Sequence, residues 1–133
     1  MNYALAYLAT LVLFATVDIT WLMTMGARLY KQTLGDILLP NVNVGAAVAF
    51  YIIYPAGLVY FAVIPALKSG SWSVALLNGA LFGMFAYATY ELTNYATLRN
   101  WTLQITVVDI AYGAIASGAV AAVVAAVFLM WRG

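Results

Sequence analysis

Three carboxylic acids, Asp18, Glu91 and Asp109, lie within otherwise apolar stretches of this sequence. Carboxylates attract cationic groups, and neighbouring aromatic rings add to that attraction. Carboxylates crowded in a medium of low dielectric cannot all remain ionised, so one of them is expected to hold a proton or to pair with a basic side chain. The chemistry open to these residues is therefore the binding of a cationic ligand in exchange for a proton.

Polar and aromatic residues close to the acids extend this candidate site. Asn94 follows Glu91 by three residues and shares its face of a helix, as Trp21 does with Asp18. The complete set that we predict for ligand binding or proton coupling is Asp18, Glu91, Asp109, Asn94, Tyr51, Trp21 and Arg99.

The composition places these residues in a membrane. Only 7% of the 133 residues are charged and 67% are hydrophobic, with a mean hydropathy of +1.01. Soluble domains average about 25% charged residues. So few charged side chains cannot cover the surface of a soluble domain of this length, so lipid must surround most of the exterior. We expect a single transmembrane domain that spans residues 1–133.

The residue inventory excludes several kinds of site. The sequence contains no cysteine and no histidine. Disulfides, thiolate nucleophiles, histidine acid–base catalysis, and zinc or haem sites built on these residues are therefore excluded. We assign no catalytic residue, no metal site and no cofactor. The net charge of +1, with no run of Lys or Arg, also argues against nucleic acid as a partner.

Hydrophobicity divides the chain into four segments, each long enough to cross a bilayer. A helix of about 20 apolar residues crosses a hydrocarbon core of about 30 Å. The predicted spans are residues 3–25, 42–67, 72–98 and 101–131. The expected fold class is all-α, an integral membrane four-helix transmembrane bundle. We expect the longest polar connection at Gly26–Asn41.

The acids are predicted to form one layer. With four spans, the connections that follow the first and third helices lie at the same membrane surface. Counted from there, Asp18, Glu91 and Asp109 lie seven, seven and eight residues inside their helices, each on the order of 10 Å deep. Tyr51 reaches the same layer, beside the backbone carbonyl that Pro55 leaves without a helical partner. A kink or a polar opening is expected there, and a pocket inside one leaflet follows.

Small residues predict where helices touch. Gly79 and Gly83 form a GxxxG pattern, which favours close contact within the bundle or between subunits. The segment Gly113–Ala126 consists almost entirely of small residues and valine, so it should also pack tightly. Tryptophans occur at three predicted helix ends, as in an aromatic belt at the membrane surface; they are Trp72, Trp101 and Trp131.

Two segments resemble each other. Ala15–Thr20 matches Ala88–Thr93 and places an acid at the same position, and Thr24 then matches Thr97. Two helical hairpins repeated in parallel would leave such a match. A chance match between apolar segments of low diversity is the alternative.

Several segments together resemble a family of small bacterial predicted membrane proteins, known as domain of unknown function two-one-seven-seven. The similar segments are Tyr87–Trp101, Asp109–Gly113, Asp18–Trp21 and Phe50–Gly57. In that family Asp is more usual at the position of Glu91, which keeps the carboxylate on a shorter arm. The resemblance covers nearly the whole chain and implies a four-helix bacterial membrane protein. It implies no activity, so it assigns no functional residue.

Three functions remain open. The first is binding or transport of a small cationic or amphipathic ligand at the carboxylate layer, with proton coupling. Four helices leave little room for a central pathway, so transport would require a homodimer. The second is an enzyme acting on a lipid or isoprenoid at the membrane surface, which ranks lower because no DDxxD run or nucleophile–base pair is present. The third is an accessory or assembly subunit of a membrane complex.

The acids also have a purely structural interpretation. Polar side chains join helices through hydrogen bonds, and one acid would pair with Arg99. Intramembrane acids are nevertheless usually functional, so we favour a working site. We expect a multi-pass protein of the bacterial inner membrane. The membrane surface that carries Arg28 and Arg99 has one more basic residue than the opposite surface. Because basic residues accumulate on the cytoplasmic side, this difference favours termini on the outer side.

Overall fold

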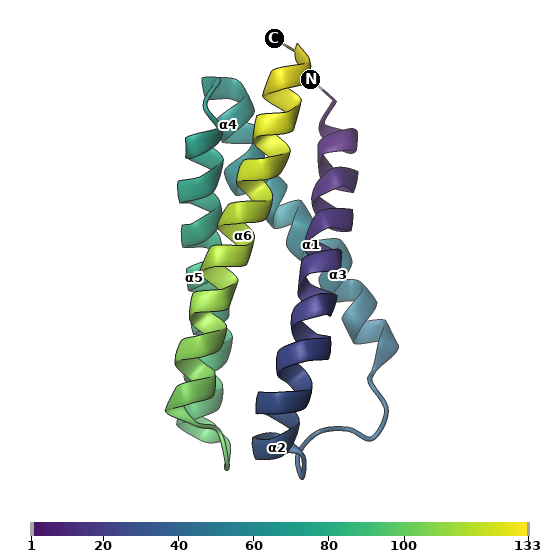
Figure 1. Cartoon of the computed structure of the whole chain (residues 1–133), viewed down its shortest axis with the longest axis vertical. Helices are drawn as coiled ribbons and strands as arrows, with labels where there is room; N and C mark the ends of the chain where they lie inside the picture. Colours follow the sequence, from purple (N-terminus) through teal and green to yellow (C-terminus); the bar gives the residue numbers. More distant parts are fainter. Residues whose placement is uncertain (1, 133) are drawn as a thin grey trace.

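The computed structural model describes residues 2–132, apart from the side chain of Ala27, and shows four long helical segments in one bundle. Both ends of the described chain lie at the same end of the bundle (Figure 1). All four segments are long and apolar enough to cross a membrane. The predicted all-α, four-helix transmembrane bundle is confirmed. The segments are α1 (Tyr3–Met25) with the π-helical turn η1 (Gly26–Tyr30) and α2 (Lys31–Leu34); α3 (Val44–Leu58) with the π-helical turn η2 (Val59–Val63) and α4 (Ile64–Ser69); α5 (Trp72–Thr97); and α6 (Leu103–Arg132).

Helix ends follow ordinary capping chemistry. The Asn2 side chain accepts a hydrogen bond from the Leu5 amide at 3.1 Å, and Asn43 caps α3 in the same way through the Ala46 amide at 3.2 Å. Gly70 ends α4 with a φ of 77°, a left-handed conformation that glycine adopts without steric strain. These local signals set the start of α1 and α3 and the sharp turn into α5.

The first helical segment is longer than predicted. We expected a polar connection from Gly26, but the chain remains helical to Leu34 through η1 and α2. No proline interrupts residues 26–34. Tyr30 and Leu34 lie four residues apart and share one face, and Leu34 is buried. The connection therefore begins at Gly35, and the extra turns carry Tyr30 into the interior.

Prolines shape the second helical segment. α3 continues through Pro55, where a kink or opening was expected, and the irregular part of this segment is the π-helical turn η2, which begins four residues later. Pro65 cannot donate a hydrogen bond to the Phe61 carbonyl, four residues earlier. The Asn78 side chain of α5 donates to that carbonyl at 3.1 Å instead.

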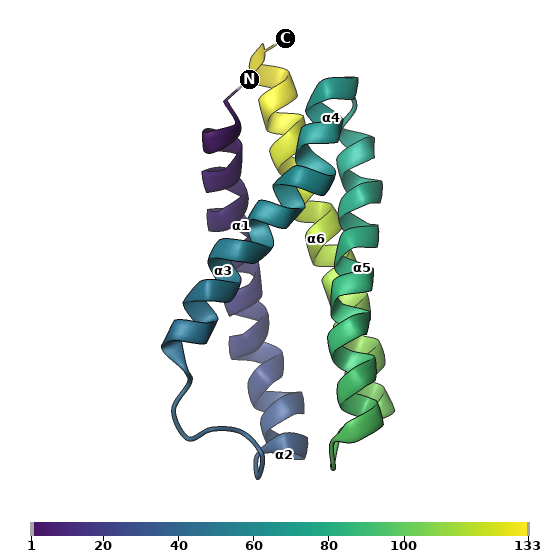
Figure 2. The same cartoon turned by 180° about the vertical axis from the view of Figure 1, so that it is seen from behind.

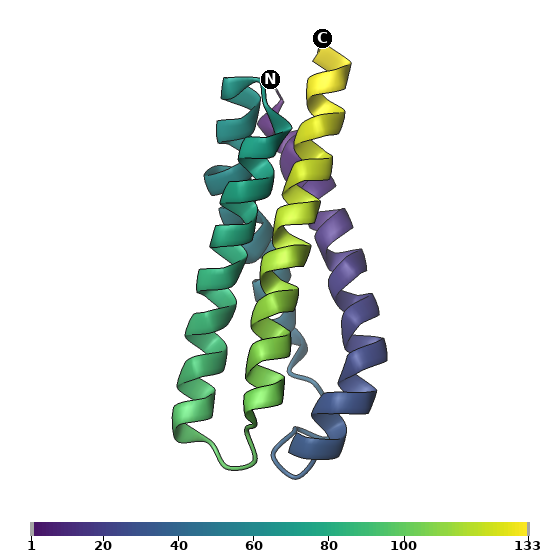
Figure 3. The same cartoon turned by 60° about the vertical axis from the view of Figure 1, so that its left-hand side comes forward.

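Helices α5 and α6 lie side by side along their length (Figure 3). Gly79 and Gly83 are buried against α6. A β-carbon at Gly79 would lie 2.8 Å from the Ser117 carbonyl oxygen, and one at Gly83 would collide with the Gly113 carbonyl. The GxxxG pattern therefore serves a contact within the bundle, because only glycine lets the two backbones come this close.

The four segments diverge away from the termini. Near the termini, small side chains of four different elements are fully buried together: Ala6, Ala62, Ala66, Ala121 and Ala125. Toward the loops, the α1–α3 side separates from the α5–α6 pair, as views from the front and from behind both show (Figures 1 and 2). The candidate site lies in this wider half.

Candidate functional site

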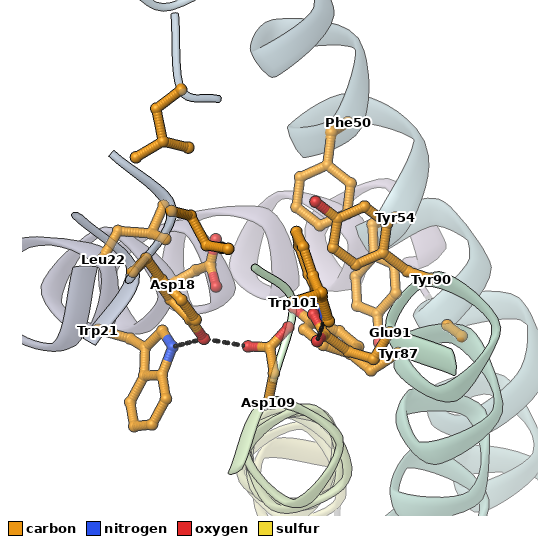
Figure 4. Close-up of a pocket in the computed structure, with 14 residues that line it drawn as sticks. Asp18, Trp21, Leu22, Phe50, Tyr54, Tyr87, Tyr90, Glu91, Trp101 and Asp109 are labelled. Carbon is orange, nitrogen blue, oxygen red and sulfur yellow. Dashed lines mark hydrogen bonds between the residues drawn. The ribbon is translucent and has the colours of Figure 1, made fainter. Parts of the chain in front are cut away.

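A pocket of about 490 Å³ lies between the diverging halves of the bundle (Figure 4). Three parts of the bundle line this pocket: the first helical segment, α3, and the α5–α6 pair. The lining residues are Asp18, Trp21, Leu22, Tyr30, Leu34, Leu38, Phe50, Tyr54, Ala86, Tyr87, Tyr90, Glu91, Trp101 and Asp109. The three acids are thus brought to one place, as their depth in the sequence predicted.

Asp18 is held by two tyrosines from different helices. The Tyr51 hydroxyl of α3 donates to Asp18 Oδ2 at 2.5 Å, and the Tyr112 hydroxyl of α6 donates to Asp18 Oδ1 at 2.9 Å. Both carboxylate oxygens therefore have a donor. The Trp21 ring stacks on Tyr112, with centroids 4.1 Å apart and an interplanar angle of 14°. The two donors come from two other helices, so together they hold the Asp18 carboxylate in one orientation.

Asp109 and Glu91 each accept a hydrogen bond from an aromatic side chain. The Tyr30 hydroxyl donates to Asp109 Oδ1 at 2.7 Å, and the Trp21 indole N–H donates to the Tyr30 oxygen at 3.4 Å. The Trp101 indole N–H donates to Glu91 Oε1 at 3.0 Å. Within residues 2–132, every donor to the three acids is a neutral group, so no basic side chain neutralises these carboxylates.

Glu91 and Asp109 also contact each other. Their carboxyl groups face one another in the pocket (Figure 4). Two carboxyl groups this close together in a medium of low dielectric do not readily ionise together. The pair is therefore the part of the site best suited to exchange a proton for a cation.

The rest of the pocket is apolar or aromatic. The hydrophobic part of the lining includes Leu34, Phe50 and Tyr87. Tyr54 also lines the pocket, and its hydroxyl lies 2.7 Å from Ser117 Oγ. Apolar walls with a few convergent polar groups are typical of small-molecule sites. The acids lie at the closed end: Glu91 is 1% exposed.

The structure does not gather every residue of the predicted site. Four predicted residues line the pocket: Asp18, Trp21, Glu91 and Asp109. Tyr51 does not line it but donates a hydrogen bond to Asp18. Asn94 is half-buried and does not line the pocket, although it shares the face of Glu91 on α5.

Pairing of an acid with Arg99, one of the two predicted alternatives, does not occur within residues 2–132. Arg99 is exposed, and within residues 2–132 no ion pair joins it to a carboxylate. α5 ends at Thr97, so the backbone has already left the helical path before Arg99. Neutral tyrosine and tryptophan donors take the place of that cation.

Three of the four aromatic residues that donate to the acids escaped the sequence analysis. Tyr112 lies three residues after Asp109, the spacing that Trp21 has from Asp18, so the same rule would have found it. Tyr30 fell in the predicted connection. Trp101 was assigned to the membrane surface, but its indole N–H turns inward to Glu91.

The matched segments of α1 and α5 run in the same direction (Figure 1), and both bring their acid to the pocket. Their threonines also match: each donates its hydroxyl to the carbonyl four residues earlier, in the pairs Thr16 and Thr89, Thr20 and Thr93, Thr24 and Thr97. The following segments differ, because η2 interrupts the second and α6 is one helix. The parallel repeat stays a prediction.

The chain matches a known protein family. Residues 3–126 match the model of domain of unknown function DUF2177, described as a predicted membrane protein. The chain belongs to this family. Its membership of DUF2177 agrees with the four membrane-spanning helices. No curated protein and no solved structure matches this DUF2177 member.

Acidic clusters can hold metal ions, which prefer oxygen ligands. Within residues 2–132, no three His, Cys, Asp or Glu side chains are arranged to hold a metal ion. Both Asp18 oxygens accept hydrogen bonds from tyrosine hydroxyls, Asp109 accepts one from Tyr30, and Glu91 accepts one from Trp101.

Proposed function

We propose that this protein binds a small cationic or amphipathic ligand in the pocket between the two diverging halves of the bundle. One observation carries the proposal: three buried carboxyl groups line an apolar pocket whose lining includes no lysine or arginine. Buried carboxylates need a compensating charge. A cationic ligand supplies it.

The two acidic groups have different parts in this proposal. Asp18 is the fixed anion, because two tyrosine hydroxyls satisfy its carboxylate without neutralising it. The Glu91–Asp109 pair is the exchangeable part. When the cation arrives, a proton leaves the pair, because two close carboxyl groups in low dielectric do not readily ionise together without a cation. One positive charge then enters as another departs, and the net charge of the pocket is unchanged.

Aromatic rings complete a site for an organic cation. Trp21, Tyr87 and Trp101 line the pocket with the acids. A cation over an aromatic face gains about 0.5–2 kcal/mol. Because this gain grows as water is excluded, ammonium groups with apolar substituents fit better than strongly hydrated ions.

Binding in the bacterial inner membrane is the setting that we propose. Transport would be proton-coupled and would require a homodimer, because small residues of four elements fill the half of each subunit that lies near the termini. Binding alone needs one subunit. The experiment below therefore measures binding first.

The test is native mass spectrometry of the protein released from mild detergent, with wild type compared with Glu91→Gln. We expect the wild type to retain a cationic ligand, or to take up an added alkylammonium ion, and to lose it as the pH falls. Glu91→Gln should bind at least about tenfold more weakly, a difference of about 1.4 kcal/mol.

The matched control is Gln104→Glu, which places an acid on the exposed part of α6. It should leave binding unchanged. If wild type and Glu91→Gln carry the same ligands at every pH and are equally stable, the acids only join helices and the proposal fails.

A further inference from the structure

We infer that the ligand is a resident of the bilayer, an aliphatic ammonium amphiphile that enters the pocket sideways between α3 and α5 from one leaflet. The inference rests on the proposed function and adds the source and chemical class of the ligand. It depends on where the pocket is open, where it is closed, and how deep its acids lie.

The pocket is open toward lipid. Four of its lining residues are large, apolar or aromatic, and exposed: Leu22 at 47%, Leu38 at 44%, Phe50 at 38% and Tyr90 at 56%. Phe50 and Tyr90 belong to α3 and α5, which separate toward the loops (Figure 2). The exposed rim of a pocket in this part of a membrane protein faces hydrocarbon, because these helices span the bilayer.

The pocket is covered on the side of the loops. Leu34 and Leu38 line it from the end of α2 and the connection that follows. The Asn100 side chain, from the turn between α5 and α6, donates to both carboxylate oxygens of Asp36, at 3.1 and 3.0 Å. This clip ties two connections together over the pocket, so a ligand from water meets a leucine-lined cover.

The depth of the acids favours an amphiphile. Glu91 lies six residues from the end of α5, and Asp109 six residues from the start of α6, which places both about 9 Å inside their helix ends. An ammonium group at that depth leaves the water, so its aliphatic chain must supply the free energy that keeps it there. A chain that passes between Phe50 and Tyr90 remains in hydrocarbon.

The tryptophans allow a direct test. Trp21 and Trp101 line the pocket, whereas Trp72 and Trp131 are exposed near the opposite end. The double substitution Trp72→Phe and Trp131→Phe leaves only the two pocket tryptophans as fluorescent reporters. This variant, in phosphatidylcholine nanodiscs, is titrated with three probes: an octadecylammonium brominated near its head group, the equally brominated octadecanol, and a brominated propylammonium.

We expect saturable quenching by the long-chain ammonium at a membrane mole fraction about tenfold below that of the alcohol, and none by the short ammonium in the same range. Glu91→Gln in the reporter background should abolish the difference between long-chain ammonium and alcohol. If Glu91→Gln fails to fold, the comparison of the three probes in the reporter protein still tests the inference.

Other results overturn the inference in separable ways. Equal quenching by the short and long ammonium ions refutes the bilayer source but keeps cation binding. Equal quenching by ammonium and alcohol refutes recognition of the charge, and the proposed function falls with it. No quenching by any probe refutes both.

Discussion

At the middle of the bundle, helices α5 and α6 meet backbone to backbone, whereas nearer the loops the same pair stands apart from α1 and α3 around a pocket. The first region, the seam between α5 and α6, is made of glycine, alanine and serine. The second is made of aromatic rings and carboxyl groups. Both lie in one bundle of continuous helices (Figure 1), so the change in side-chain size along each helix produces the change in spacing.

The two regions also differ in how they gain stability. Helices in lipid associate through van der Waals packing and hydrogen bonds, because burial from lipid brings little hydrophobic free energy. The packed region is stabilised by van der Waals packing. The open region is stabilised by hydrogen bonds that tyrosine and tryptophan side chains donate to the acids. The open pocket is thus stabilised by the hydrogen bonds between its acids and their aromatic donors.

The largest expected effect breaks the packed region. In Gly83→Leu, the new side chain would collide with the Gly113 carbonyl and with Ser117, whose Oγ and Cβ lie 2.6 and 2.7 Å from the position of the first added carbon. We expect a loss of about 3 kcal/mol or more in the free energy of unfolding, measured by SDS titration in mixed micelles.

Ala119→Leu is the matched control, because Ala119 is exposed on α6. It enlarges a side chain by three carbons, one fewer than Gly83→Leu, on the neighbouring helix α6 at a position that faces lipid, and its effect should stay within about 0.5 kcal/mol. Equal losses in Gly83→Leu and Ala119→Leu would show that α5 and α6 do not meet at this face.

The next effect breaks the open region. Tyr112→Phe keeps the ring that stacks on Trp21 but removes the hydroxyl that donates to Asp18. One oxygen of a buried carboxylate then lacks its donor, and we expect a loss of about 1–3 kcal/mol together with weaker ligand binding. Tyr95→Phe removes an exposed hydroxyl; if it costs as much as Tyr112→Phe, the Asp18 network contributes nothing.

Much of the contrast between the regions could be predicted from the sequence. Composition and length alone required four membrane helices, and the GxxxG pattern marked the packed face of α5. What could not be predicted was where the first helix ends. A segment of mixed polarity such as Gly26–Leu34 is compatible with a loop or a helix, and the choice depends on Tyr30 and Leu34 finding places inside the bundle.

The candidate site was predictable in its acids but not in their partners. Asp18, Glu91 and Asp109 stand out because charge is rare in these helices, and counting residues placed them at one depth. Tyrosine and tryptophan are common in membrane helices, so nothing distinguishes a donor from a lipid-facing ring before the helices are assembled. Arg99 misled for the opposite reason, since a charge was expected to pair with a charge.

A smaller effect tests the junction between the two regions. Asn78→Leu removes the donor to the Phe61 carbonyl, which Pro65 leaves without an N–H. We expect a loss of about 0.6–1.7 kcal/mol in unfolding free energy, the size measured for hydrogen bonds between membrane helices. Pro65→Ala restores a backbone donor, so the double variant should lose less than the sum of the two single changes. Strict additivity would contradict this account.

The smallest effect concerns the cover of the open region, and it separates the clip from the turn that holds it. Asn100 has a φ of 65°, so Asn100→Ala combines loss of its bonds to Asp36 with about 1–2 kcal/mol of left-handed strain. Asn100→Gly removes the bonds alone and should change stability by no more than about 0.5 kcal/mol. Hydrogen exchange of residues 35–43 should nevertheless quicken in Asn100→Gly and equally in Asp36→Ala, because each removes one half of the same clip. If neither variant exchanges faster than wild type, the connection covers the pocket without the clip, and the apolar contacts of Leu34 and Leu38 hold it in place.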